Sequence, residues 1–166
     1  MTKSLSAALL LSVALSLPAM AQSAAPPMKL FTAGADIPAV IAKARADQKS
    51  PTVNSVEPVA VYGPYRVLLE YRTGLTPPTV HHGLTELVYV LQGNATLVSG
   101  GHLTGVQPPR PGSTTDAGTG IEGADKSQAL AKGDILLVPA ETAHQFQNVT
   151  GEFVIVSVHM LMPESK

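Results

Sequence analysis

The stretch that decides the fold is Gly74 to Gly93, with the sequence GLTPPTVHHGLTELVYVLQG. A Pro-Pro turn leads to two adjacent histidines, His81 and His82, and Glu86 follows a few residues later. The run 87–91 after this carboxylate is apolar, with branched and aromatic side chains, which is typical of a buried β-strand. Imidazoles beside a carboxylate at the mouth of an apolar strand indicate a metal centre in a β-barrel.

A second stretch, Gly133 to Asn148, has the sequence GDILLVPAETAHQFQN and is organised in the same way. Its apolar strand ends at Pro139, and a short turn then leads to His144. Two separate parts of the chain therefore each place a metal-binding side-chain type next to a buried strand.

Together the two stretches resemble the cupin family, whose motifs are G-(x)5-H-x-H-(x)3,4-E-(x)6-G and G-(x)5-P-x-G-(x)2-H-(x)3-N. The run PPTVHHGLTE is similar to the corresponding run of germin-type cupins, but Thr79 stands where the first histidine is expected. In the second motif Glu141 replaces the middle glycine. The resemblance implies an all-β fold, the cupin double-stranded β-helix or jelly-roll barrel, with one short N-terminal helix.

The resemblance also implies one divalent metal ion per chain, held by His81, Glu86 and His144. Two imidazoles and one carboxylate favour iron or manganese, with zinc as the competitor. His82 points to the opposite face in this register, and a one-residue slip of the strand would exchange it with His81. Four further residues are expected to line the pocket: Thr79, Val88, Val90 and Phe146. The alternative is a cupin whose pocket holds no metal.

Residues 1–21 have the pattern of a secretory signal peptide. Lys3 precedes the apolar run 5–17, and Ala19-Met20-Ala21 fits a small-residue cleavage site. The run is too short to span a membrane. We therefore expect an exported protein, periplasmic or secreted, cleaved after Ala21. Since the chain of 166 residues has no cysteine, its fold must depend on a sizeable core and not on disulfides.

The charge of the chain limits its partners. The formal net charge is −1, and Lys and Arg form no run. Nucleic acids and anionic membrane surfaces are therefore poor partners, and we expect neither. A small-molecule ligand, or another copy of the protein, fits this composition better.

Around the motifs, residues 22–56 are expected to form a flexible start and one short amphipathic helix over 36–48. Asp36 is suited to cap this helix, and Pro38 to its first turn. The barrel is expected to span 57–163.

The strand predicted over 65–72 alternates an aromatic and aliphatic face with a more polar one that includes Glu70 and Arg72. The sequence does not decide which face is inside the barrel. A polar face inside would contact a ligand, whereas one outside would simply be solvated, and the second alternative is favoured.

The segment 100–132 is longer than the usual connection between the two cupin motifs. It is rich in Pro, Gly, Ser and Thr, so we expect a long inserted loop without regular structure. Such a loop is either a functional lid or a disordered excursion, and its length favours neither.

The strand predicted over 152–161 is apolar on both faces, and such a strand is covered on both sides. The core covers one side, and the helix or a second subunit must cover the other. This pattern favours a homodimer over a monomer.

Three function classes remain open, because one fold hosts many functions. The favoured class is a metal-dependent enzyme, a dioxygenase-like oxidoreductase or another metal-assisted catalyst, that acts on a small organic or phenolic molecule. The others are a non-catalytic small-ligand-binding protein and a metal-free structural cupin. No catalytic residue can be assigned beyond the metal ligands.

Overall fold

The structure is a computed structural model that describes residues 27–109 and 111–162. The predicted signal peptide, 1–21, lies outside these residues. Within them the chain is mostly β-structure with one short α-helix, which confirms the predicted fold class. In chain order the elements are η1 Gly34–Asp36, α1 Ile37–Asp47, β1 Ser55–Tyr62, β2 Tyr65–Arg72, β3 Thr79–His81, β4 Leu84–Ser99, β5 His102–Thr104, β6 Thr115–Ala117, β7 Gly120–Glu122, β8 Lys126–Leu130, β9 Ile135–Val138 and β10 His144–Leu161.

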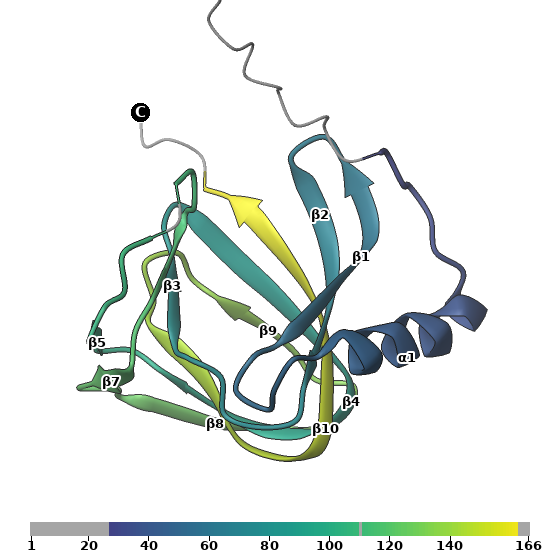
Figure 1. Cartoon of the computed structure of the whole chain (residues 1–166). Helices are drawn as coiled ribbons and strands as arrows, with labels where there is room; N and C mark the ends of the chain where they lie inside the picture. Colours follow the sequence, from purple (N-terminus) through teal and green to yellow (C-terminus); the bar gives the residue numbers. More distant parts are fainter. Residues whose placement is uncertain (1–26, 110, 163–166) are drawn as a thin grey trace, which may run out of the picture.

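Two long strands, β4 and β10, form the central pair of a curled antiparallel sheet (Figure 1). They pair over their whole lengths, from Leu84 opposite Leu161 to Ser99 opposite His144. One half of β10 also pairs with β2, which pairs with β1, and its other end meets β3. On the other side of the pair, β4 is bordered by β9 and then β8. This curvature gives the sheet a concave inner face.

The strand β4 changes direction at Gly93, where the inward-facing positions also change. Val88 and Val90 face inward before it, whereas Ala95 and Leu97 do so after it. Gly93 has a φ of 82°, and a Cβ atom there would lie 2.0 Å from the carbonyl oxygen of Glu152. Only glycine fits this left-handed position, which allows one strand to serve both halves of the barrel.

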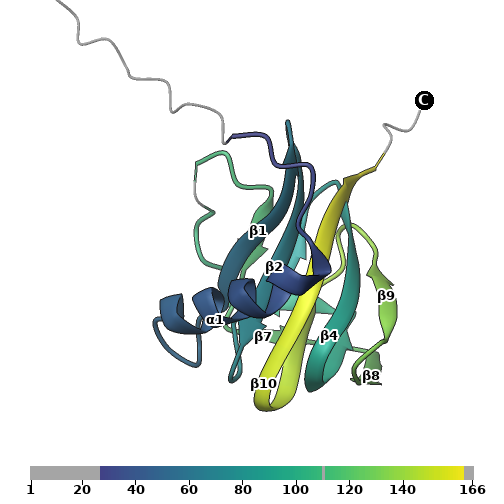
Figure 2. The ribbon, with the colours of Figure 1, turned by 90° about the vertical axis from the view of Figure 1, so that its right-hand side faces the viewer.

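The helix α1 covers the outer face of the sheet, over β1 and β2 (Figure 2). Its apolar side packs against a cluster that includes Leu69, Tyr71 and Val154. No helix among residues 27–109 and 111–162 is long and apolar enough to cross a membrane.

Because Leu69 and Tyr71 face the helix, the alternate residues of β2 face inward. Glu70 lies opposite Ile155, and Arg72 lies opposite Phe153. Both charged residues are only 6% exposed. The favoured expectation of a solvated polar face on this strand is therefore wrong. Helix α1 packs on the apolar face of β2, so the polar face lies in the interior.

The segment 100–132 is not the unstructured loop that its composition predicts. It contains the four short strands β5 to β8. β5 pairs with β7, β6 pairs with β3, and β8 pairs with β4, so three of its strand pairings build or extend the sheets. Glycines with positive φ, among them Gly101 and Gly123, supply the tight turns that connect these strands.

Candidate metal centre

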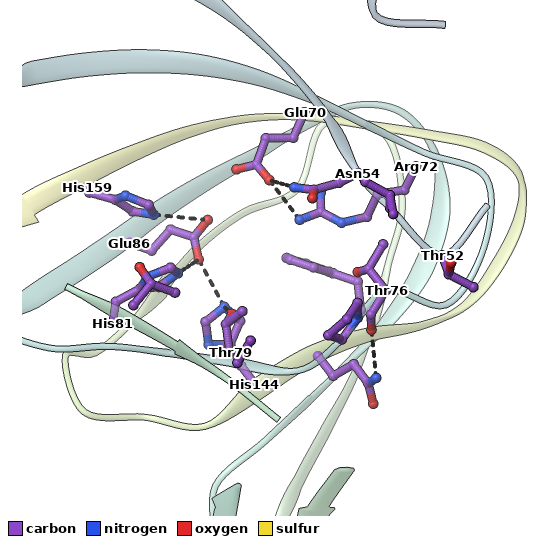
Figure 3. Close-up of a pocket in the computed structure, with 16 residues that line it drawn as sticks. Thr52, Asn54, Glu70, Arg72, Thr76, Thr79, His81, Glu86, His144 and His159 are labelled. Carbon is purple, nitrogen blue, oxygen red and sulfur yellow. Dashed lines mark hydrogen bonds and ion pairs between the residues drawn. The ribbon is translucent and has the colours of Figure 1, made fainter. Parts of the chain in front are cut away.

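The inner face of the sheet encloses a cavity of about 380 Å³ with two polar ends (Figure 3). At one end, Glu86 is surrounded by three imidazoles, those of His81, His144 and His159. At the other end, Arg72 lies beside the carboxylate of Glu70, and Asn54 donates to the same carboxylate.

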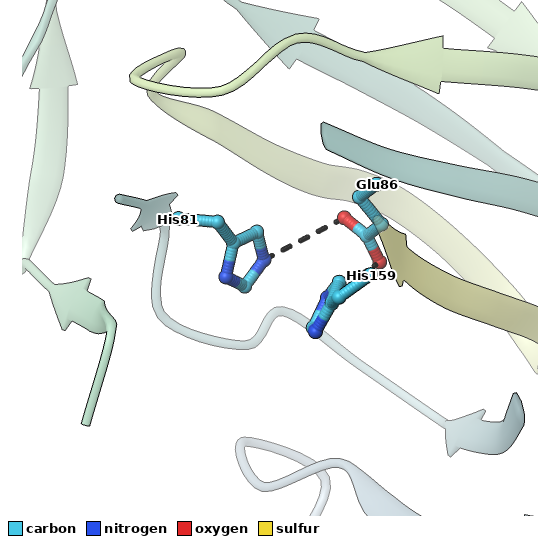
Figure 4. Close-up of side chains that lie close together, drawn as sticks. All are labelled: His81, Glu86 and His159. Atoms are coloured by element: carbon cyan, nitrogen blue, oxygen red, sulfur yellow. Dashed lines mark ion pairs between the residues drawn. The ribbon is translucent and has the colours of Figure 1, made fainter. Parts of the chain in front are cut away.

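Glu86 is the centre of the first end and is 2% exposed. Its Oε2 lies 3.2 Å from Nε2 of His144 and 3.6 Å from Nε2 of His81. Its Oε1 lies 3.8 Å from Nε2 of His159. His81, Glu86 and His159 each place one ligand atom within 4.8 Å of the others. Figure 4 shows these three side chains close together. Three donor side chains therefore converge on one small volume, and His144 adjoins it through Oε2 of Glu86.

Strand pairing explains this convergence. Glu86 on β4 and His159 on β10 are direct cross-strand partners, and such partners share one face of the sheet. His144, at the other end of β10, lies opposite Thr79 of β3. His81 is two residues beyond Thr79 on β3, so its side chain points to the same face.

The hydrogen bonds of His144 leave two acceptor atoms facing each other. Its Nδ1 donates to the carbonyl oxygen of Thr142 at 3.1 Å. In a neutral ring Nε2 is then an acceptor, and it points at Oε2 of Glu86, a second acceptor. Among the described residues, Oε2 of Glu86 and Nε2 of His159 are both buried and have no hydrogen-bond partner. A cation between these lone pairs would satisfy them together, so this donor set fits a divalent metal ion.

The electrostatics agree with this interpretation. Burial raises the pKa of Glu86, but His144, His159 and His81 outweigh it and hold the pKa well below its usual value. Glu86 in turn raises the pKa of His159, against the opposite effect of burial, so a metal ion bound by this ring would have to displace its proton. The centre therefore keeps a carboxylate ionised inside the protein, which a metal ligand requires.

Of the residues predicted for the site, His81, Glu86 and His144 lie together at this end of the cavity. Thr79 and Phe146 line the cavity, as expected. Val88 and Val90 do not line it, because they are completely buried deeper in the apolar core.

His82 points away from the cavity, as strand alternation predicts. Its Nδ1 lies 2.7 Å from Oε2 of Glu141 and its Nε2 lies 3.0 Å from Oδ2 of Asp116. Asp116 and then Glu141 raise its pKa. Both of its ring nitrogens are therefore engaged at the surface.

His159 was not predicted as a site residue, since no motif position covers it. The sequence nevertheless contained a signal for it. His159 follows Phe153, Ile155 and Ser157 at intervals of two residues, and these three residues are completely buried on the inner face. A histidine that continues an inward-facing row of a strand is expected in the interior.

The second end of the cavity is held by charged hydrogen bonds. Oε2 of Glu70 accepts from Nη2 of Arg72 at 2.8 Å and from Nδ2 of Asn54 at 2.9 Å. Its Oε1 accepts from the hydroxyl of Ser157. The Arg72 guanidinium lies 4.8 Å above the ring of Phe146. Phe146 also contacts His144, ring edge to face at 6.3 Å, so this one ring touches both ends.

Comparisons with known proteins agree with this architecture. The family model of the cupins matches residues 50–163. A cupin superfamily protein from Desulfitobacterium hafniense DCB-2 has a TM-score of 0.50 and 14% identity, with 82% of this chain and 100% of that chain covered. A protein of Thermus thermophilus, TT1209, has a TM-score of 0.49 and 17% identity, with 72% and 93% covered. KdgF from Halomonas sp. has a TM-score of 0.48 and 14% identity, with 71% and 88% covered. At 14% identity the likeness to the Desulfitobacterium hafniense protein shows the fold alone. No curated protein sequence matches the chain.

Proposed function

The chain belongs to the cupin family, and we propose that it binds one divalent metal ion through Glu86 and the imidazoles of His81, His144 and His159. The supporting observation is the buried carboxylate oxygen without a partner, surrounded by ring nitrogens. In this proposal His159 replaces the first histidine of the motif, whose position Thr79 occupies in this chain. The mixed imidazole and carboxylate set favours iron or manganese, with zinc as the competitor.

Metal analysis of purified protein, produced with iron, manganese and zinc supplied, tests this proposal. We expect about one ion per chain, and a higher melting temperature with metal, since a ligand at a hundred times its Kd stabilises by about 2.7 kcal/mol. Glu86→Gln should lose the ion. The matched control is Glu122→Gln, which alters an exposed carboxylate beside exposed His102. Wild-type protein with almost no metal, and a melt indifferent to chelator, would contradict the proposal.

We further propose that the centre acts on a small organic molecule, in a dioxygenase-like or other metal-assisted reaction. The residues around Glu86 would hold the ion, and a bound divalent ion would supply a Lewis acid next to the cavity. Oxygen uptake by the iron-loaded protein, measured with a panel of phenolic acids against the metal-free protein, tests this activity. Uptake equal to that of the metal-free protein across the panel would contradict it.

One observation favours the second candidate, a non-catalytic ligand-binding protein. Glu70 is the carboxylate that lines the cavity in addition to Glu86, and three donors already occupy its oxygens. A carboxylate so engaged is a poor general base. Tight binding of a panel compound without any turnover would establish this candidate.

For the quaternary structure we propose a homodimer through the outer face of β4, β9 and β10. Tyr89 lies opposite Ile135, and Leu87 lies opposite Leu137. Ile135 is 69% and Leu137 is 57% exposed, so an uncharged apolar surface faces outward there. A second copy offers the matching apolar face. Light scattering should give the molar mass of a dimer for the wild-type protein and that of a monomer for Leu137→Glu. A monomeric wild-type protein would contradict the proposal.

For localisation we propose export with cleavage after Ala21, on the signal-peptide pattern of residues 1–21. The intact mass of protein recovered from outside the cytoplasm tests it. A mature chain that still begins at Met1 would overturn it.

A further inference from the structure

The guanidinium of Arg72 carries hydrogen-bond donors that the protein leaves unused. Arg72 is 6% exposed and lines the cavity. Its Nη2 donates to Glu70, but Nε and Nη1 are buried and have no partner among the described residues. A guanidinium has five N–H groups, so at least three of them lack an acceptor. Leaving buried donors unsatisfied is costly, and it is expected where a ligand supplies the acceptor.

The surrounding contacts hold this guanidinium in place for a ligand. Glu70 anchors one nitrogen, and the ring of Phe146 covers one face of the guanidinium plane at 4.8 Å. Glu70 is itself fixed by Asn54 and Ser157. A planar fork fixed in this way suits a planar pair of acceptor oxygens, which is the geometry of a carboxylate.

The formal charges of the cavity favour a monoanion. Glu70 and Arg72 cancel one another. At the other end a divalent ion exceeds the single charge of Glu86 by one, if the proposed metal is bound. A ligand with one negative charge would therefore leave the buried cavity neutral, and burying a neutral set of groups is the least costly arrangement.

We propose that the cavity binds a small organic monocarboxylate that carries a second oxygen, with its carboxylate on Arg72 and the second oxygen directed at the metal. This inference rests on the proposed metal centre for the second contact and for the charge balance of the cavity. Apolar lining from Val53, Pro77 and Ala117 accommodates a hydrocarbon body between the two polar groups, within about 380 Å³.

The test uses a pair of probes that differ in charge but hardly in shape, 3-hydroxybenzoate and 3-hydroxybenzamide. Binding to the metal-loaded protein is measured by calorimetry. We expect the carboxylate to bind at least about tenfold more tightly, as for a charge-assisted hydrogen-bonded pair. Equal affinities for the two probes would overturn the proposal.

Two variants assign the preference to Arg72. Glu70→Gln removes the competing carboxylate and should widen the gap between the probes. Glu70→Gln/Arg72→Gln removes both charges together, so that no lone buried charge disturbs folding, and it should close the gap. A gap that persists in a folded double variant would overturn the proposal.

Measurements on chelator-treated protein separate this inference from the metal proposal, with metal content recorded for each sample. We expect both probes to bind more weakly and the carboxylate to keep a reduced preference, because the charge of Glu86 is no longer balanced without the metal. If the preference for the carboxylate probe disappears when the metal is removed, the carboxylate binds the metal and not Arg72. That result would overturn the inference. A chain that binds no metal, yet prefers the carboxylate only while Arg72 is present, would overturn the metal proposal and support the Arg72 contact.

Discussion

The two ends of the cavity are incomplete in opposite senses. Around Glu86, lone pairs of a carboxylate and of imidazoles face one another, and a cation is required between them. Around Arg72, buried N–H groups have no acceptor among residues 27–109 and 111–162, and the proposed carboxylate would supply one. The contrast shows that a single interior can be prepared for a metal ion and for an organic acid at once, provided that the two sets of groups are kept apart.

The separation depends on Phe146, so the largest effect is expected from Phe146→Ala. Phe146 is 3% exposed, and truncating such a ring lowers the free energy of unfolding by about 3 to 5 kcal/mol. Metal stoichiometry should stay the same, whereas the preference for 3-hydroxybenzoate should fall because the guanidinium loses its support. Denaturant melts, metal analysis and calorimetry measure the three quantities.

The matched control for that variant is Phe153→Ala. Phe153 is completely buried and contacts Phe146, but it does not line the cavity. A similar loss of stability with an unchanged probe preference is expected. If Phe146→Ala removed the metal as well, the two ends would not be separable.

The next largest effect concerns the metal end and the role given to His159. His159→Ala should weaken metal binding by at least about tenfold, since loss of even an outer-shell partner has that effect, with little change in the preference for the carboxylate probe. Thr79→His should place an imidazole beside His144, whose Nε2 is 3.4 Å from the Thr79 hydroxyl, and should restore affinity in the His159→Ala background. Metal titration measures both variants, with exposed His102→Ala as control. If the second substitution restores nothing, position 159 does not replace position 79.

The smallest effect is expected at His82, which is satisfied on both sides outside the cavity. Its pKa is raised above 6.5 by Asp116 and Glu141, so its ion pairs stabilise the fold fully below that value and lose this contribution as pH rises through the raised pKa. His82→Gln should therefore lower the melting temperature slightly near pH 6 and not near pH 9, a contribution below about 1 kcal/mol. Metal affinity should be unchanged; a large loss would mean that β3 is slipped by one residue.

The sequence predicted the fold and most of the metal end because the two motifs fix local spacing and strand alternation fixes faces. It did not predict the contribution of β10. His144 and His159 differ by an odd number of positions, so simple alternation places them on opposite faces. The pairing of β10 with β4 shifts register between Gln147 and Ile155, which returns both to the interior. Such irregularities depend on tertiary pairing and leave no clear pattern in the chain.

The sequence did not predict that Arg72 faces the interior, for a different reason. The alternation in β2 was evident, but the choice of inner face depended on where α1 would pack. Helix α1 covers Leu69 and Tyr71, and only this contact turns Glu70 and Arg72 inward. The segment 100–132 was misjudged because its strands are only three to five residues long, too short for a periodic signal.

The order of the donor side chains along the sequence determines when the proposed metal centre can form during folding. Two of its four donors, His144 and His159, belong to the last strand, whereas His81 and Glu86 come more than fifty residues earlier. During synthesis, only His81 and Glu86 are available to the proposed site until β10 pairs with β4. Contacts so distant in sequence form late and slowly. If the proposed ion is bound, it binds after β10 has docked, so the metals available at that stage of folding decide which ion the site takes.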